Sequence, residues 1–451
     1  MNIRTNISWN LRSALALVAI AVSAVLTACD RVTDPLLKVE TPDIVTPDKA
    51  SSAAGAQSLF IAAQGDFARF IGGDRGGSSP LGLNLTGGLL ADELISSRSG
   101  TEHLDNRAIV PAGFPVSTWN QVGASYTRIL RAIRGIETFP PATGGPDQLA
   151  LLHAMEGMLL TVTAEHYCNG IPLWDGQSDT DPATVTLSTA ELYTRAIAEF
   201  DKAIAGTTVA NTINMATIGK ARAILDLATP ATLAASSASA ASLVAGILTS
   251  YKFNVVFGTS TAGLNNAIYN WANATKNFGA VDKEGGNGLD YISSGDPRIK
   301  VDPTKVSAGQ DGTRTPALNQ YTTPDAPITI ASGIEARLIQ AESQLVNNDP
   351  TWIVTLNNAR ATIGLGPLTP APTVAGQQDQ LFRERAFWMY LTAHRLGDMR
   401  RLVRQYGRGA ETVYPTGSYF KGGAYGTDVV LPPFQDETNN PNWAGCTDSK
   451  A

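Results

Sequence analysis

Residues 378–405 read QDQLFRERAFWMYLTAHRLGDMRRLVRQ, a segment in which charged side chains are interleaved with large apolar ones at helical spacing. Arg395 and Asp398 are one turn apart, a spacing at which opposite charges can pair on a helix. Apolar residues such as Phe387 fall between the charged ones, so packing of the helix would bury charges as well. We therefore predict one long helix in the core, with Gly397 as the candidate position for a bend and with paired, structural charges.

Further helices are predicted in the preceding sequence, each with an apolar stripe that it cannot bury alone. Ser188 and Glu191 form a capping box at the start of one of them. Helix pairs of this length favour tetratricopeptide-like packing, although the sequence signature of that repeat is not present. The expected helices span residues 50–70, 119–139, 147–167, 188–205, 217–228, 236–250, 334–345 and 351–363.

Two stretches lack helical periodicity. Residues from the glycine-rich turn at 72–77 to about Pro115 are expected to form a loop region. Residues 250–327 are rich in Gly, Asn, Thr and aromatic side chains, which indicates an irregular, loop-rich insertion. The expected fold class is therefore mostly α, built of tetratricopeptide-like helix pairs that carry this insertion.

The N-terminus has the features of a lipoprotein leader. Arg4 and Arg12 precede an apolar run at 14–25, which is too short for a membrane span, and the sequence Leu-Thr-Ala-Cys ends at Cys29. We expect residues 1–28 to be a signal peptide and Cys29 to carry the lipid. Residues 29–49, rich in Pro, Thr and Asp, are expected to be a flexible tether, and residues 50–451 a single domain.

Composition excludes one class of partner. The whole chain has a net charge of −6, and loss of the two leader arginines changes it to −8. Such an acidic chain is a poor candidate for binding nucleic acid. Outside the leader, no stretch is long and apolar enough to cross a membrane.

Two cysteines remain when Cys29 is assigned to the lipid. An even pair in an exported chain is compatible with a disulfide, which here would join Cys168 to Cys446 across a long loop. Two separate buried thiols fit the sequence as well, so both states stay open.

Catalytic motifs are scarce. The four histidines do not form H-E-x-x-H, and the chain holds no G-x-S-x-G, Walker loop or G-x-G-x-x-G. The acidic loop at 175–181 lacks EF-hand spacing and is expected to be solvated, and His394 is expected to be a hydrogen-bonded core residue. The adjacent carboxylates Asp92 and Glu93 are a weak signal for acid–base chemistry. We expect no catalytic residue, metal or cofactor.

Several segments together resemble the SusD/RagB family of outer-membrane nutrient-binding lipoproteins. The "E-R … H-R-x-x-D-x-R-R" pattern at 384–401 is the most specific, and the helix at 149–166 runs into a "G-x-P-L" turn at 170–173. The order matches the family over nearly the whole mature chain. The other matching segments are residues 119–136, 295–298, 334–345, 356–367 and 431–442.

This resemblance implies a lipid-anchored binding protein, not an enzyme. It would capture a nutrient, in many relatives an oligosaccharide, as a lid over a TonB-dependent, SusC-like transporter of the outer membrane. The expected location is the outer membrane, on the cell-surface side. The chain is short for the family, and the acidic run after the lipid cysteine is reduced to Asp30.

The insertion is the first choice for a ligand site because sugar sites combine aromatic faces with polar side chains. Its candidate ligand residues are Tyr269, Asn270, Trp271 and Tyr291, supported by Phe278 and Asn287. The alternative is that these aromatics form a small core beneath a long loop. Second choices are Asp74 and Arg75, with Asn84 and the segment 92–107.

Two other functions remain open. A lipid-anchored glycoside hydrolase would need a carboxylate pair in a cleft at hydrolase separation. A helical-repeat scaffold that binds only protein would show a concave groove without an aromatic ligand site. The sequence identifies neither the ligand nor the particular transporter.

Overall fold

Helices dominate the structure, which confirms the predicted fold class. The computed structural model describes residues 51–73, 81–111, 115–174 and 184–450, so the predicted leader, Cys29 and the tether lie outside the described residues. The α-helices are α3 (Ala53–Gly72), α4 (Gly82–Leu90), α5 (Glu102–Asp105), α6 (Pro115–Thr138), α7 (Gly145–His166), α8 (Thr189–Gly206), α9 (Ala210–Leu227), α10 (Leu233–Leu243), α11 (Gly333–Val346), α12 (Trp352–Ala361), α13 (Val374–Trp388), α14 (Arg395–Arg404) and α15 (Ala410–Val413). In the described ranges, no helix is both long and apolar enough to cross a membrane.

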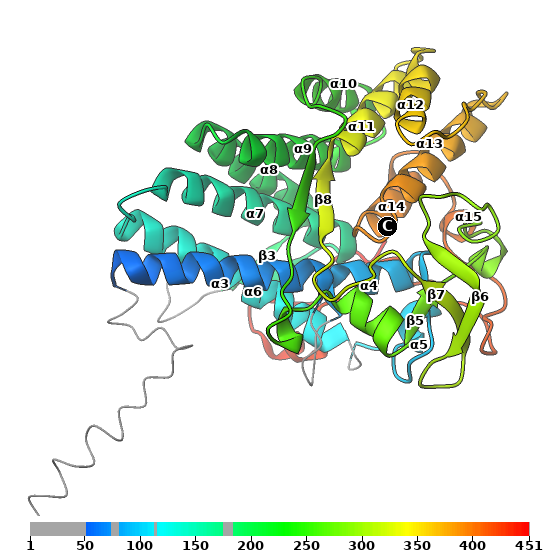
Figure 1. The fold of residues 1–451 in the computed structure, drawn as a ribbon, viewed down its shortest axis with the longest axis horizontal. Coiled ribbons are helices and arrows are strands. Elements are labelled where there is room, and N and C mark those ends of the chain that lie inside the picture. The colour runs from blue at the N-terminus through cyan, green and yellow to red at the C-terminus, as the bar shows by residue number, and fades with distance from the viewer. Residues whose placement is uncertain (1–50, 74–80, 112–114, 175–183, 451) are drawn as a thin grey trace, which may run out of the picture. The chain divides into compact units, whose positions relative to one another are not determined.

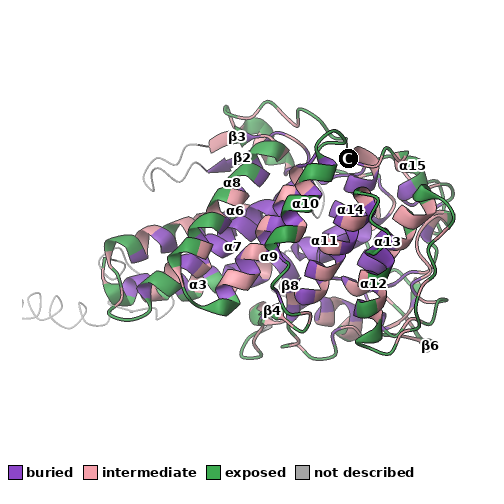
Figure 2. Cartoon of the chain, turned by 90° about the horizontal axis from the view of Figure 1, so that it is seen from above, coloured by how far each residue is buried: buried purple, intermediate pink, exposed green. Residues whose placement is uncertain are grey.

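Long helices pack side by side in pairs, as α3 does with α6, α7 with α8, α8 with α9, and α11 with α12 (Figure 1). Their facing stripes are the buried part of the molecule (Figure 2). Phe200 on α8 is fully buried, and a Cβ on Gly157 or Gly219 would come within 2.8 or 2.4 Å of its ring. These two glycines let α7 and α9 approach the Phe200 ring closely.

One predicted helix start is confirmed, whereas two other helices differ from their predicted ranges. The predicted Ser188–Glu191 capping box is present. A cap that was not predicted lies at the start of α11, where the Ser332 side chain accepts the Glu335 N–H. Helix α9 begins at Ala210 rather than 217, since burial of Thr212 and Met215 outweighs the weak helix propensity of that turn. Helix α10 ends at Leu243 rather than 250.

The segment 378–405 is not one helix bent at Gly397. It is broken between α13 and α14, where Leu391 and Ala393 adopt left-handed φ values of 54° and 62°. The Leu391 carbonyl accepts hydrogen bonds from Asn84 Nδ2 (2.5 Å) and the Tyr321 hydroxyl (2.8 Å). Tertiary contacts thus satisfy the backbone that the break exposes.

The loop region predicted at 72–115 contains a helix that sequence reasoning missed. Every residue of α4 is buried, including Asn84 and Thr86. Gly82 begins α4 with a φ of 71°, and a Cβ there would lie 2.2 Å from the Gly73 nitrogen. The segment, with three glycines in nine residues, is helical because of its buried surroundings rather than its propensity.

The insertion is irregular as predicted, with short antiparallel strand pairs and 3₁₀ or π turns. Strand β5 pairs with β1, β4 with β8, and β6 with β7, while β2 and β3 form a separate pair. Figure 1 shows β5, β6 and β7 grouped beside α5 and away from α8 and α9. The remaining elements are β1 (Leu94–Ser96), β2 (Ile171–Trp174), β3 (Thr184–Leu187), β4 (Lys252–Val255), η1 (Ala262–Leu264), η2 (Tyr269–Ala274), β5 (Phe278–Ala280), η3 (Glu284–Gly286), β6 (Val301–Ala308), β7 (Arg314–Leu318), β8 (Ile328–Ser332) and η4 (Gln435–Asn439).

The C-terminal tail is attached to the centre of the chain. A disulfide joins Cys168, just after α7, to Cys446, with the two Cα atoms 5.9 Å apart. The backbone of Asn169 also bonds to Thr447 and Asp448. The sequence left open whether Cys168 and Cys446 are bonded or separate thiols, and in the structure they are bonded.

Candidate functional site

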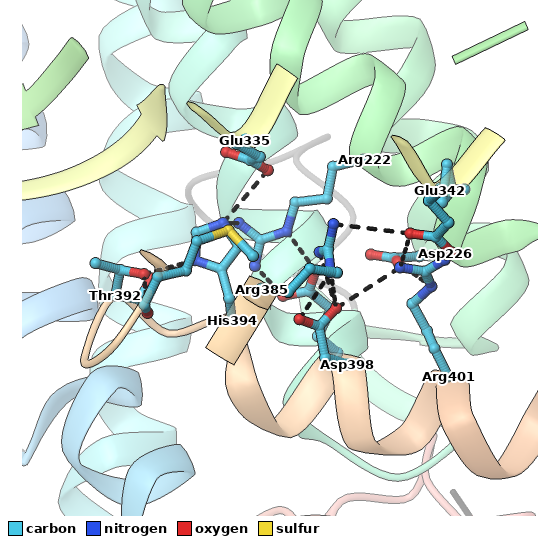
Figure 3. Close-up of polar contacts among 12 residues, drawn as sticks. Arg222, Asp226, Glu335, Glu342, Arg385, Thr392, His394, Asp398 and Arg401 are labelled. Atoms are coloured by element: carbon cyan, nitrogen blue, oxygen red, sulfur yellow. Dashed lines mark hydrogen bonds and ion pairs between the residues drawn. The ribbon is translucent and has the colours of Figure 1, made fainter. Parts of the chain in front are cut away.

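The charged residues of α13 and α14 form a buried ion-pair network (Figure 3). Arg385 binds Asp398 at 2.8–2.9 Å, and Arg401 pairs with Glu342 on α11. Their side chains are at most 4% exposed, so no ligand contacts them directly. The prediction that these charges are paired in the core is confirmed.

His394 belongs to the same network. Its ring contacts Arg222 at 2.8 Å and Glu335 at 3.3 Å. Burial, together with the charge of Arg222, holds the pKa of His394 below its ordinary value. The prediction that His394 is a hydrogen-bonded core residue is confirmed.

The adjacent carboxylates Asp92 and Glu93 are also buried. Arg395 binds both oxygens of Asp92, at 2.6 and 2.8 Å. Glu93 accepts the Leu391 backbone N–H at 2.9 Å, and burial raises its pKa to about 8. Both carboxylates are at most 1% exposed, so they stabilise the α13–α14 break and are not open to a substrate.

The first-choice ligand residues are only partly accessible. Tyr269 and Trp271 on η2 are half-buried and pack against the core, whereas Asn270 is buried. Arg98 lies with its guanidinium carbon 4.5 Å from the centre of the Trp271 ring, and Phe278 meets that ring edge-on. The structure thus brings together η2 and the segment after β1, which was a second choice.

Tyr291 must be corrected as a candidate. It is 1% exposed and packs between Phe387 and Tyr390, with ring centres 5.2 and 4.9 Å away. Its hydroxyl contacts Asp92 at 3.4 Å. The alternative of a small aromatic core beneath the insertion therefore applies to Tyr291, because its contacts leave no face for a ligand.

Other second-choice residues are either buried or outside the described residues. Asn84 is fully buried and bonded to Leu391, so it is not available to a ligand. Arg107 is buried as well, with its guanidinium bonded to the Asp428 and Pro415 carbonyls. Asp74, Arg75 and the acidic loop at 175–181 lie outside the described residues.

Sequence reasoning missed an exposed aromatic in the C-terminal tail. Phe420 is 48% exposed, and it is the only aromatic among the large, exposed hydrophobic side chains of the described ranges. Lys421 beside it pairs with Asp311 at 2.6 Å, and the Asp311 backbone N–H bonds to the Ser97 carbonyl. The signal available in the sequence was the glycine-rich tail segment 417–426, GSYFKGGAYG, with three aromatics.

We call Arg98, Trp271, Asp311, Phe420 and Lys421 the loop face. Ser97 links its parts, since the Ser97 N–H bonds to the Asn277 carbonyl, just after η2. The loop face combines aromatic rings with two cations and a carboxylate. Sugar rings stack on aromatic faces, and charged side chains bond their hydroxyls, so this chemistry suits a saccharide.

Two buried carboxylates, Asp105 and Glu284, bind tyrosines of the tail segment that carries Phe420. Tyr419 donates to Asp105 at 2.8 Å, and Tyr425 donates to Glu284 at 3.1 Å. Burial raises the pKa of Asp105 to about 6, and burial together with Asp105 raises the pKa of Glu284. The two acids hold the hydroxyls of Tyr419 and Tyr425, and the Tyr419 ring packs edge-on against both Phe420 and Tyr425.

Comparisons with known proteins assign the fold. No family model matches the sequence, and no curated protein matches it. A laminarin-binding SusD-like protein superposes with a TM-score of 0.63 at 14% identity, over 88% of this chain and 99% of its own. A SusD superfamily protein from Bacteroides thetaiotaomicron gives 0.65 at 14% over 88% and 99%. NanU from B. fragilis gives 0.65 at 11% over 90% and 99%.

These structures are matched over nearly their entire length. In this chain, the helices that carried the sequence motifs, including α7, α11, α13 and α14, contribute buried residues to the hydrophobic core. The chain therefore has the SusD-like fold, as the sequence motifs indicated.

Proposed function

We propose that this protein is a lipid-anchored glycan-binding protein that delivers a saccharide to a TonB-dependent, SusC-like transporter. The observation that carries the proposal is the SusD-like fold, matched over 99% of a laminarin-binding structure. Two further solved structures of this fold are described as a SusD-like carbohydrate-binding protein and as a putative sugar-binding protein.

The loop face is the proposed glycan-binding surface. Phe420 offers an exposed ring, and Trp271, backed by Phe278, offers a second, partly covered one. Lys421 and Asp311 restrain each other, so their polar atoms are held in place before a sugar arrives. Binding by such a surface needs no catalytic group, consistent with the burial of Asp92 and Glu93.

Retention of polysaccharides in native affinity gels tests the binding step. Laminarin and a panel of other soluble glucans, mannans and xylans are the probes. Phe420→Ala should weaken binding of the retained polysaccharide roughly two- to tenfold, the range expected for one aromatic contact. Val256→Ala, at a position 73% exposed on the end of β4, is the matched control and should leave binding unchanged.

The outcomes separate the competing functions. Binding that Phe420→Ala leaves unchanged would remove the loop face from the proposal. Release of reducing sugar from a bound polysaccharide would favour the glycoside hydrolase. Failure of every polysaccharide to bind, with a folded protein, would favour the protein-binding scaffold.

The anchor and the transporter require a separate experiment. The leader with Leu-Thr-Ala-Cys supports lipid attachment at Cys29, and the resemblance to the SusD/RagB family supports a place in the outer membrane, on its outer surface. Tagged protein purified in detergent from its native membrane should bring down a large barrel in near-equal amount. Cys29→Ala should lose the lipid and the membrane fraction. Lipidated, folded protein that recovers no barrel would contradict delivery to a transporter.

A further inference from the structure

A second polar cluster lies within the helix pair α7–α8, away from the loop face. His153 and Glu156 are one turn apart on α7, and Glu199 faces them from α8. One ligand atom from each side chain can be chosen so that all three lie within 4.8 Å of one another. His153 Nδ1 and Glu199 Oε2 are 2.7 Å apart.

The chemistry of this set is that of a metal site. One imidazole nitrogen and two carboxylates match the ligands of zinc centres that keep a fourth position open. Mixed nitrogen and oxygen ligands favour zinc and its first-row neighbours over calcium or magnesium, which prefer oxygen alone. Helices α7 and α8 are packed along their length, so these three ligands are held on a rigid scaffold.

Two carboxylates meet in this cluster. Glu156 is 6% exposed and its carboxylate lies close to that of Glu199, so two like charges meet between the helices and favour a cation there. Lys202 compensates in part, since its ammonium donates to the second oxygen of Glu199 at 2.7 Å.

A cavity gives access to the cluster. It has a volume of about 540 Å³ and is lined mostly by apolar residues between the end of α6 and the start of α7. Its polar lining consists of His153, Lys202 and Glu137. Water or a small ligand in this cavity could reach a metal bound at His153.

We propose that His153, Glu156 and Glu199 bind one divalent transition-metal ion of the zinc class, with its open position toward this cavity. The ion would offset the negative charge of the two carboxylates. The site is independent of glycan capture, because it stands on α7 and α8 and shares no residue with the loop face.

Calorimetric titration of the purified, tag-free protein with Zn²⁺ tests the proposal. The protein carries Cys29→Ser, which removes the one cysteine outside the disulfide. We expect one ion per chain, and Ca²⁺ at the same concentrations should not compete. His153→Ala, Glu156→Gln and Glu199→Gln should each weaken zinc binding by at least roughly tenfold, since even outer-shell changes cost that much.

Two further variants distinguish a metal site from a merely structural cluster. Glu137 lines the same cavity but is not a proposed ligand, so Glu137→Gln should bind zinc as tightly as the parent does. Lys202→Met removes the ammonium that competes for Glu199 and should tighten zinc binding. Circular dichroism of each variant without metal verifies that it is folded.

The proposal is overturned if the folded parent protein binds no zinc. It is also overturned if the folded ligand variants bind zinc as tightly as Glu137→Gln does, because the ion would then be held elsewhere on the surface.

Discussion

Removal of one charge from the network in Figure 3 should destabilise the protein far more than removal of the same charge at its surface. In Asp398→Asn, the new amide N–H₂ would face the Arg385 guanidinium, which now donates from Nε and Nη2 at 2.8–2.9 Å. The other carboxylate near Arg385 is Glu342, at 3.7 Å, and Arg401 already binds it. The variant would therefore leave a buried guanidinium short of a partner.

The magnitude follows from burial. The side chains of Arg385 and Asp398 are 4% and 3% exposed, and breaking such a pair costs about 3–5 kcal/mol. Asp379 pairs with Arg408 at 2.8 Å, but its side chain is 63% exposed. Asp379→Asn should cost at most about 1 kcal/mol, because water screens the exposed pair. The two variants make the same chemical change in opposite surroundings.

Urea unfolding followed by circular dichroism measures both free energies. Desolvation raises the pKa of Asp398, but Arg385 and Arg401 lower it further, and the net pKa lies below the ordinary value of 3.8. Its stabilisation is therefore present above that value and lost as the pH falls below it, so Asp398→Asn should be less sensitive to acid. Equal losses in the two variants at pH 7 would refute the reasoning.

Two more stability predictions follow from buried groups. Glu93→Gln keeps an acceptor for the Leu391 N–H. Because the pKa of Glu93 is raised from 4.5 to about 8, the free energy of unfolding of the parent should fall as the pH rises between these two values, by up to roughly 1.4 kcal/mol per pH unit. Urea unfolding at pH 5 to 8 should show that the variant has lost this slope. Gly219→Ala should cost about 1–3 kcal/mol of stability, because the added Cβ overpacks against Phe200. Gly123→Ala is the control: a Cβ there meets nothing within 4 Å, so the variant should gain up to about 1 kcal/mol from helix propensity. A Gly219→Ala variant that is more stable than the parent in thermal unfolding would contradict the close approach.

Much of the fold could be predicted from local patterns. The helices at α3, α6, α7, α8 and α11 follow from apolar stripes and caps, which depend on residues within a few turns of one another. The missed helix α4 and the break after Trp388 depend on distant partners, such as Asn84 bonding to Leu391, and no local pattern encodes those contacts.

The candidate site could be predicted only in part. The insertion and Trp271 were identified, but composition cannot tell a stacked core tyrosine such as Tyr291 from a ligand-facing one. Phe420 joins the loop face through contacts of its neighbour Lys421 with Asp311, 110 residues earlier in the sequence. A surface assembled from such distant segments exists only after folding.

The sequence by itself therefore determined the fold class and the interpretation of the charged segment 378–405 as paired core, while the leader with Cys29 stays a prediction. Each of these depends on spacing along the chain, which the sequence states directly. Only the tertiary structure decided which aromatics remain exposed, that Cys168 bonds to Cys446, and that His153, Glu156 and Glu199 meet across two helices. Burial and long-range contact are properties of three-dimensional packing, and spacing along the chain does not contain them.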